Sequence, residues 1–84
     1  MRAMKQSTAK TYELTTAAIQ AVVRADHRAW KKFGNDEAKR EQYVLSCFRR
    51  AGKLIGEATA VAETKAAKAA VKDAHEVVRK YIFN

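Results

Sequence analysis

Residues 59–82 read TAVAETKAAKAAVKDAHEVVRKYI, a stretch of strong helix formers without glycine or proline. When this stretch forms a helix of about 3.6 residues per turn, its larger apolar side chains fall on one side of the helix. This stripe consists of Val71, Ala74, Val77, Val78, Tyr81 and Ile82. Because the stripe is strong only from Ala67 onward and Glu63 interrupts it earlier, we expect the opening turns to be exposed or frayed. The stretch predicts a helix that packs along one face, and it indicates an all-α fold.

A line of basic side chains runs along a different side of the same predicted helix. It consists of Lys65, Lys68, Lys72, His75 and Arg79. Their spacings of three, four, three and four residues place them one above another on a helix. One face of this helix is therefore suited to packing, and the other is suited to contact with negative charge.

Residues 8–33 predict a long first helix, which Ser7 or Thr8 can begin by capping an exposed backbone N–H. Its apolar side holds Tyr12, Ile19, Val22, Val23, Trp30 and Phe33, with Thr15, Ala18 and Ala29 at the margin. This amphipathic pattern persists to the end of the segment. We expect the large side chains, Trp30 included, to enter the core.

Gly34 predicts the end of the first helix, because glycine readily takes the left-handed conformation found after a helix C-terminus. Asn35 or Asp36 can then cap a second helix over residues 36–55. The inward face of this second helix is predicted to hold Val44, Cys47, Phe48, Ala51 and Ile55. The sequence Phe33-Gly34-Asn35-Asp36 thus indicates a tight turn between two helices.

The join between the second and third helices is less sharply marked. Gly52 and Gly56 weaken a helix, but no proline breaks it, so one continuous helix from residue 36 to residue 81 is an alternative. In such a helix the apolar faces of the two segments would lie far apart around the cylinder. That mismatch favours a turn or kink near residues 56–59, and a third helix over residues 59–82.

The length of the chain predicts a single helical domain over residues 1–84. Hydrophobic residues make up 48% of it, but many of these are alanine, whose methyl group buries little area. A monomer of this size buries a small core and often associates with itself. We therefore expect a small three-helix bundle, or a helical hairpin with a third helix, that homodimerisation could complete.

The charge of the chain favours acidic partners. Lys and Arg number 17 against nine Asp and Glu, for a formal net charge of +8. The candidate binding residues are Arg24, Arg28, Lys31 and Lys32 on the first helix, Arg49, Arg50 and Lys53 on the second, and Lys65, Lys68, Lys72 and Arg79 on the third. Such stripes suit nucleic acid, through sequence-tolerant phosphate contacts, or an acidic protein surface. They are also compatible with solvated faces that serve solubility alone.

A second hypothesis is that this is a small accessory or phage-type protein that modulates or inhibits a larger host complex by helical docking. Alanine ridges on the first and third helices permit close approach of another helix or of a second copy. The apolar segment Tyr81-Ile82-Phe83 either closes the core or anchors a partner. The two hypotheses remain open at the level of sequence.

The residues with catalytic or metal-binding chemistry form no motif. His27, Cys47 and His75 are spread over three predicted helices without the short-range pairs typical of metal sites. The three glycines form no phosphate-binding loop. We therefore expect no enzyme activity, no cofactor and no small-molecule substrate. The single cysteine indicates a buried thiol, and the lack of a membrane span or secretory signal predicts a cytoplasmic protein.

Overall fold

The computed structural model of the protein describes residues 6–83, and these residues fold into four α-helices joined by short turns. The helices are α1 Gln6–Val22, α2 Ala25–Phe33, α3 Glu37–Val61 and α4 Lys65–Phe83. No strand occurs in this part of the chain, so the predicted all-α helical bundle is confirmed. None of the described helices is both long enough and apolar enough to cross a membrane.

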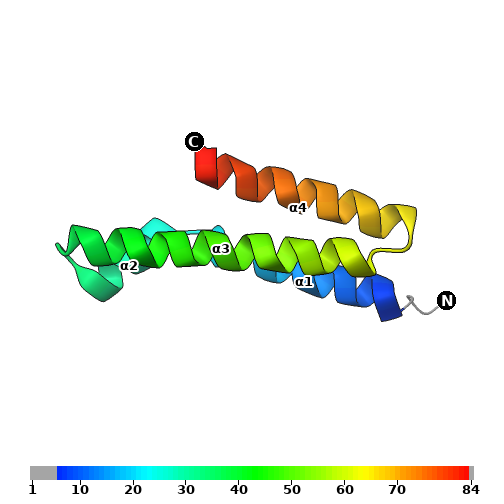
Figure 1. Ribbon diagram of the computed structural model, residues 1–84, viewed down its shortest axis with the longest axis horizontal. Helices are drawn as coiled ribbons and strands as arrows, with labels where there is room; N and C mark the ends of the chain where they lie inside the picture. The colour runs from blue at the N-terminus through cyan, green and yellow to red at the C-terminus, as the bar shows by residue number, and fades with distance from the viewer. Residues whose placement is uncertain (1–5, 84) are drawn as a thin grey trace.

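The helices form an elongated bundle that is three helices thick at one end and two at the other. α1 and α2 follow each other along one edge, and α3 runs back antiparallel to both (Figure 1). α4 then returns in the direction of α1 and packs on α1 and α3. It ends part-way along α3, so the hairpin made by α2 and the start of α3 extends beyond its last turn (Figure 1).

A single helix over residues 8–33 is wrong, because Val23 and Arg24 form a turn between α1 and α2. Arg24 lies in the left-handed region at φ 57°, a conformation that ends a helix. The guanidinium of Arg28 reaches back and donates hydrogen bonds to the carbonyl oxygens of Ala21 at 2.7 Å and Val23 at 3.2 Å. A helix end leaves such carbonyls without intrahelical partners. A charged side chain of α2 therefore holds the end of α1.

Replacing Arg28 by alanine is expected to destabilise the fold by about 1–3 kcal/mol, because α1 loses hydrogen bonds from a charged donor. Arg28→Lys should recover part of the loss, since an ammonium group cannot span several carbonyls as a planar fork does. Arg50→Ala, at an exposed position, is the matched control. Urea unfolding followed by circular dichroism measures both, and equal stability of Arg28→Ala and Arg50→Ala would contradict the assigned role.

The predicted turn between α2 and α3 is confirmed. Gly34 has φ 55° and ψ −125°, and its N–H donates to the carbonyl oxygen of Trp30 at 2.9 Å. Asp36 caps α3, because its carboxylate accepts a hydrogen bond from the backbone N–H of Lys39 at 3.2 Å. Residues with a Cβ rarely adopt the backbone angles of Gly34, so glycine is needed here for its conformation.

Alanine substitutions at Gly34 and Gly52 are expected to have opposite effects on stability. Gly34→Ala should destabilise by about 1–3 kcal/mol, because it forces a Cβ into a positive-φ conformation. Gly52→Ala should stabilise by about 0.5–1 kcal/mol, because Gly52 lies inside α3 and an added Cβ meets nothing within 4 Å. Thermal unfolding of the two variants is the measurement. If both substitutions raised the stability of the protein, or both lowered it, this explanation would be contradicted.

The join between the last two helices lies later in the chain than predicted. α3 continues through Gly56 to Val61, because glycine weakens a helix without ending one that is packed on its neighbours. α4 begins after Thr64, whose hydroxyl accepts a hydrogen bond from the N–H of Ala67 at 3.1 Å and lies 3.3 Å from the hydroxyl of Thr8. The opening residues of the predicted helix are exposed at Glu63, Lys65 and Ala66, as expected, and burial begins at Ala67, where the apolar stripe becomes strong.

Thr8 lies inside α1 and pairs with Thr64, so it does not begin the first helix as a cap. Ser7 is likewise inside α1, and its carbonyl oxygen accepts a hydrogen bond from the hydroxyl of Thr11 at 2.8 Å. Residues 1–5, which precede the first described turn, lie outside the described residues. The hydroxyl of Thr11 therefore bonds within α1, and the hydroxyl of Thr8 links α1 to the start of α4.

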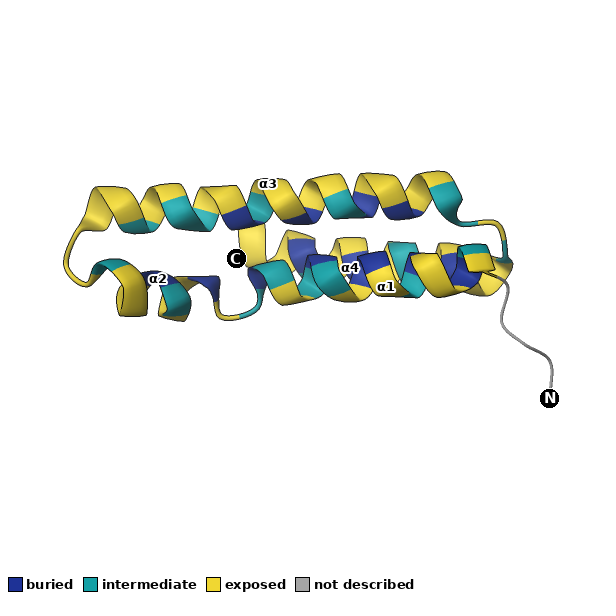
Figure 2. Cartoon of the chain, turned by 90° about the horizontal axis from the view of Figure 1, so that it is seen from below, coloured by how far each residue is buried: buried dark blue, intermediate teal, exposed yellow. Residues whose placement is uncertain are grey.

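The core is built from small side chains. Its central cluster contains Ala18, Val22, Ala51, Ile55 and Val78. Figure 2 shows the buried positions along the inner faces of α1, α3 and α4. Alanine at these positions lets the helix axes approach closely, since a methyl group projects little from a helix. Burial of Cys47, which the sequence predicted, is confirmed.

The predicted core is confirmed in part, since Val22, Cys47, Ala51, Ile55, Ala74 and Val78 are buried, but other positions differ from the prediction. The residues placed at the margin of the first helix, Thr15, Ala18 and Ala29, are buried. Three large side chains expected inside are exposed, Trp30 at 51%, Tyr81 at 45% and Ile82 at 41%, and Leu45 is also 51% exposed. Trp30 and Leu45 are exposed because α4 is short: it ends before it can cover the hairpin formed by α2 and the start of α3 (Figure 1).

Candidate nucleic-acid interface

A groove of about 470 Å³ lies between α3 and α4. Its lining consists of Gly52, Ile55 and Gly56 from α3 and His75, Val78, Arg79 and Ile82 from α4. No side chain rises from α3 at the two glycines, and an added Cβ at either would meet nothing within 4 Å. The described lining contains no carboxylate. The groove therefore combines a stretch of α3 that carries two glycines with a side of α4 on which His75 and Arg79 flank apolar residues.

The basic line of α4 runs along this groove. His75 and Arg79 line it directly, and Lys68 and Lys72 lie two turns before them on the same side of the helix. Lys65 continues the line to the start of α4. From Lys65 to Arg79 the line extends about 21 Å at about 1.5 Å per residue. The five side chains are exposed, as the helical spacing predicted.

Two basic side chains of α3 lie near the groove without lining it. Arg49 lies two turns before Gly56 and so shares its side of α3, and Lys53 lies one turn before Gly56 on the adjoining surface. Both side chains are exposed. Arg50 lies on a different side, because it is two turns after Tyr43, which faces α2. The structure thus separates the three predicted basic residues of α3.

The predicted basic residues of α2 are separated from the α4 line. Arg28 and Lys32 lie over the ring of Tyr43, at 5.9 Å and 5.2 Å from its centroid. Tyr43 and Gly52 are nine residues apart, about half a turn out of phase, so they face opposite sides of α3. Lys31 is exposed on α2, and Arg24 is exposed in the turn before α2, where it lines a small cavity together with Tyr81 of α4. The two predicted stripes therefore do not form one continuous surface.

The remaining candidate residues do not assemble a chemical centre in the part of the chain that the structure describes. No group of three or more His, Cys, Asp or Glu side chains among these residues could hold a metal ion. Cys47 lies in the core, whereas His27 and His75 are exposed on α2 and α4. The surface with the clearest chemical character is the basic groove.

Sequence reasoning found the basic line of α4 but missed the groove beside it. Gly52 and Gly56 were interpreted as weak points of a helix, although their spacing of four residues places them on one side of α3. Two glycines at this spacing are the signal that could have indicated an open surface. Which helix lies opposite them depends on the packing of the whole chain.

The chain was compared with the patterns of known protein families, with curated proteins and with solved structures. None of the three comparisons finds a significant match. The geometry of the described residues is consequently the basis on which a function can be inferred.

Proposed function

We propose that this protein is a non-enzymatic nucleic-acid-binding protein that holds a phosphate backbone along the α3–α4 groove. One observation carries the proposal: His75 and Arg79 line a groove whose described lining contains no carboxylate, and helix periodicity places the other basic residues of the α4 line on the same side of α4. Arg49 shares the side of α3 on which Gly56 lines this groove. The residues expected to contact phosphate are Arg49, Lys65, Lys68, Lys72 and Arg79, with Lys53 at the margin.

The mechanism is charge neutralisation. Each lysine or arginine that pairs with a phosphate releases a condensed counterion, so affinity arises from charge and falls as salt rises. Lys65, Lys68 and Lys72 follow one another at about 4.5 and 6 Å along the axis, and Arg79 lies about 10.5 Å beyond Lys72, so the line presents a series of positive charges to a phosphate chain. The glycine positions on α3 allow a backbone to approach without a steric barrier.

The proposal assigns no role in base recognition. Trp30, the single tryptophan, lies on the α2–α3 hairpin and does not line the α3–α4 groove. Tyr43 is engaged by the cations of α2 on the far side of α3. Binding through phosphates alone is sequence-tolerant. Arg28 contributes to the fold rather than to the proposed interface.

The direct test is titration of labelled single-stranded DNA, duplex DNA and RNA with the protein over a range of salt concentrations. Five phosphate contacts predict a slope of log affinity against log salt of about −3.5 for a single strand and about −4.5 for a duplex. Affinity should therefore fall by about a hundred-fold or more between about 50 and 200 mM salt. Absence of saturable binding at low salt, or binding that salt does not weaken, would overturn the proposal.

A further inference from the structure

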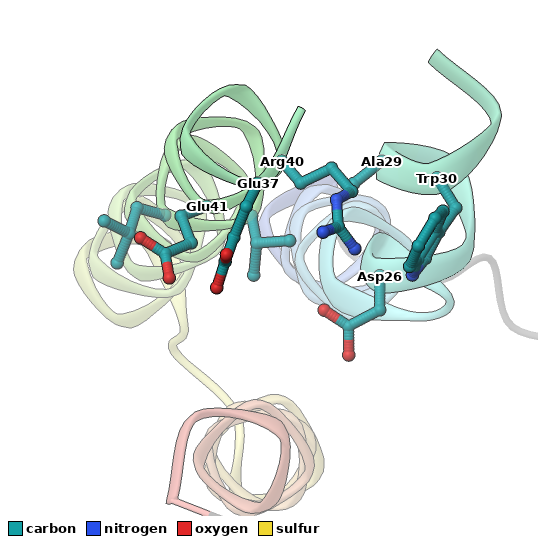
Figure 3. Close-up of a pocket in the computed structure, with 8 residues that line it drawn as sticks. Asp26, Ala29, Trp30, Glu37, Arg40 and Glu41 are labelled. Atoms are coloured by element: carbon teal, nitrogen blue, oxygen red, sulfur yellow. The ribbon is translucent and has the colours of Figure 1, made fainter. Parts of the chain in front are cut away.

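The α2–α3 hairpin carries a second, chemically different groove beyond the end of α4. This groove has a volume of about 540 Å³ and lies between α2 and the first turns of α3. Its lining includes the apolar side chains of Trp30 and Leu45 and the carboxylates of Asp26, Glu37 and Glu41. Figure 3 shows the three carboxylates pointing toward the side of the hairpin on which α4 lies.

The groove continues the surface on which α4 is seated. Val44 lines it, and Phe48 and Ile55 follow on the same side of α3 and pack toward α4. Asp26 lines this groove and also a small cavity beside Tyr81 in the last turns of α4. An α-helix placed end to end with α4 would therefore lie along the hairpin as α4 lies along the rest of the bundle.

Two of the four exposed large apolar side chains of the described residues line this groove, and a third lies near its end. Trp30 and Leu45 are each 51% exposed and line it, and Tyr81 is 45% exposed at the end nearest α4. The guanidinium of Arg40 stacks over the ring of Trp30, with its Cζ 3.8 Å from the ring centroid. This contact holds the indole in place at the groove. A positioned aromatic ring beside an apolar depression is typical of an anchor point in a protein interface.

The carboxylates that line the groove favour a partner with positive charge. Asp26, Glu37 and Glu41 form no ion pair with another described residue, although the chain as a whole has a net charge of +8. Arg40 is the one cation in the described lining, and its charge faces the Trp30 ring. A partner with lysine or arginine flanking an apolar stripe would pair with the three carboxylates. A second copy presenting the same groove would instead bring like charges together.

We propose that the α2–α3 hairpin is a docking site for an amphipathic helix of another protein, which carries an apolar stripe flanked by lysine or arginine. The docked helix lies in line with α4 and extends the three-helix part of the bundle over the hairpin. It buries Trp30 and Leu45, and its cations face Asp26, Glu37 and Glu41. This surface is distinct from the α3–α4 groove, so the proposal goes beyond nucleic-acid binding.

The probe is a blocked helical peptide of about 14 residues, roughly 21 Å long, with leucine at helical spacing, lysine elsewhere and no aromatic residue. A second peptide carries glutamate in place of lysine. The fluorescence of Trp30, the only tryptophan of the chain, reports binding at the groove. We expect the lysine peptide to produce a saturable shift of the emission to shorter wavelength, and the glutamate peptide to produce none at the same concentrations.

The variant Asp26→Asn/Glu37→Gln/Glu41→Gln tests the carboxylates. It should weaken binding of the lysine peptide by about ten-fold, as three partly exposed charge pairs are lost. The matched control is Glu57→Gln/Asp73→Asn/Glu76→Gln, which changes the net charge equally at exposed positions outside the described lining. Circular dichroism establishes that both variants are folded, and the control should bind as the unmodified protein does.

Three outcomes would overturn the proposal. The first is equal binding of the lysine and glutamate peptides, which would leave no role for charge. The second is equal affinity of the groove variant and the control variant. The third is a concentration-dependent emission shift of Trp30 without peptide, together with dimer formation in sedimentation, which would assign the groove to a second copy. Nucleic-acid binding of the groove variant is a separate readout, because Asp26, Glu37 and Glu41 lie outside the lining of the α3–α4 groove.

Discussion

Replacing Ala51 by leucine is expected to lower the melting temperature of the protein markedly. Ala51 is completely buried where α3 packs on α1, in one cluster with Ala18 and Val22. A leucine side chain would force the two helices apart or into strained rotamers, at a cost of about 1–3 kcal/mol. A domain of this size has a total stability of only about 4–12 kcal/mol. We expect the melting temperature to fall by roughly 5–20 °C.

Ala60→Leu is the matched control for this substitution, because Ala60 is exposed on the same helix. The control should change stability by less than about 0.5 kcal/mol. Thermal unfolding followed by circular dichroism at 222 nm, the usual helix signal, compares the two variants. If Ala51→Leu melts at the same temperature as Ala60→Leu, the close contact between α1 and α3 at Ala51 does not exist.

Reversing three charges of the α4 line is expected to abolish most nucleic-acid affinity. In Lys65→Glu/Lys68→Glu/Lys72→Glu, three phosphate contacts are lost and three repulsive charges are added along the groove. At about 50 mM salt we expect affinity to fall at least about a hundred-fold, and the salt slope to fall by about 2–3. Fluorescence anisotropy with labelled single-stranded and duplex DNA measures both quantities.

The control with the same net charge is Lys10→Glu/Lys31→Glu/Lys39→Glu. These lysines are exposed on α1, α2 and the first turn of α3, outside the α3–α4 groove. Lys10 and Lys39 lie 3.8 Å and 3.9 Å from Glu13 and Asp36, so their charges are already partly neutralised. If both triple variants lose affinity equally, binding depends on net charge alone and the groove is not the site.

The position of α4 links the two proposed surfaces. Its outer edge forms one wall of the basic groove, and its last turns stop beside Asp26 at the entrance to the acidic groove. The same chain thus presents a basic surface at its three-helix end and an acidic, apolar surface at its two-helix end. Occupation of the hairpin by a basic helix would leave the α3–α4 groove accessible, because Gly52 and Gly56 lie beyond the hairpin.

Local features of the sequence determined the helical content and several details of the site. The turn at Gly34, the cap at Asp36 and the buried Cys47 were predicted, because each depends on the conformational preference or hydrophobic pattern of a few adjacent residues. The line from Lys65 to Arg79 was predicted for the same reason. Side chains at spacings of three and four share a side of a helix whatever that helix packs against.

Only the tertiary structure decided where the first helix breaks and which apolar residues are buried. The break at Arg24 is held by Arg28 reaching back to α1, an interaction between helices that amphipathic periodicity does not encode. Trp30 and Leu45 are exposed because α4 ends before the hairpin, and the groove exists because α4 lies beside Gly52 and Gly56. Periodicity shows which side chains share a face, but burial also requires a neighbour long enough to cover it.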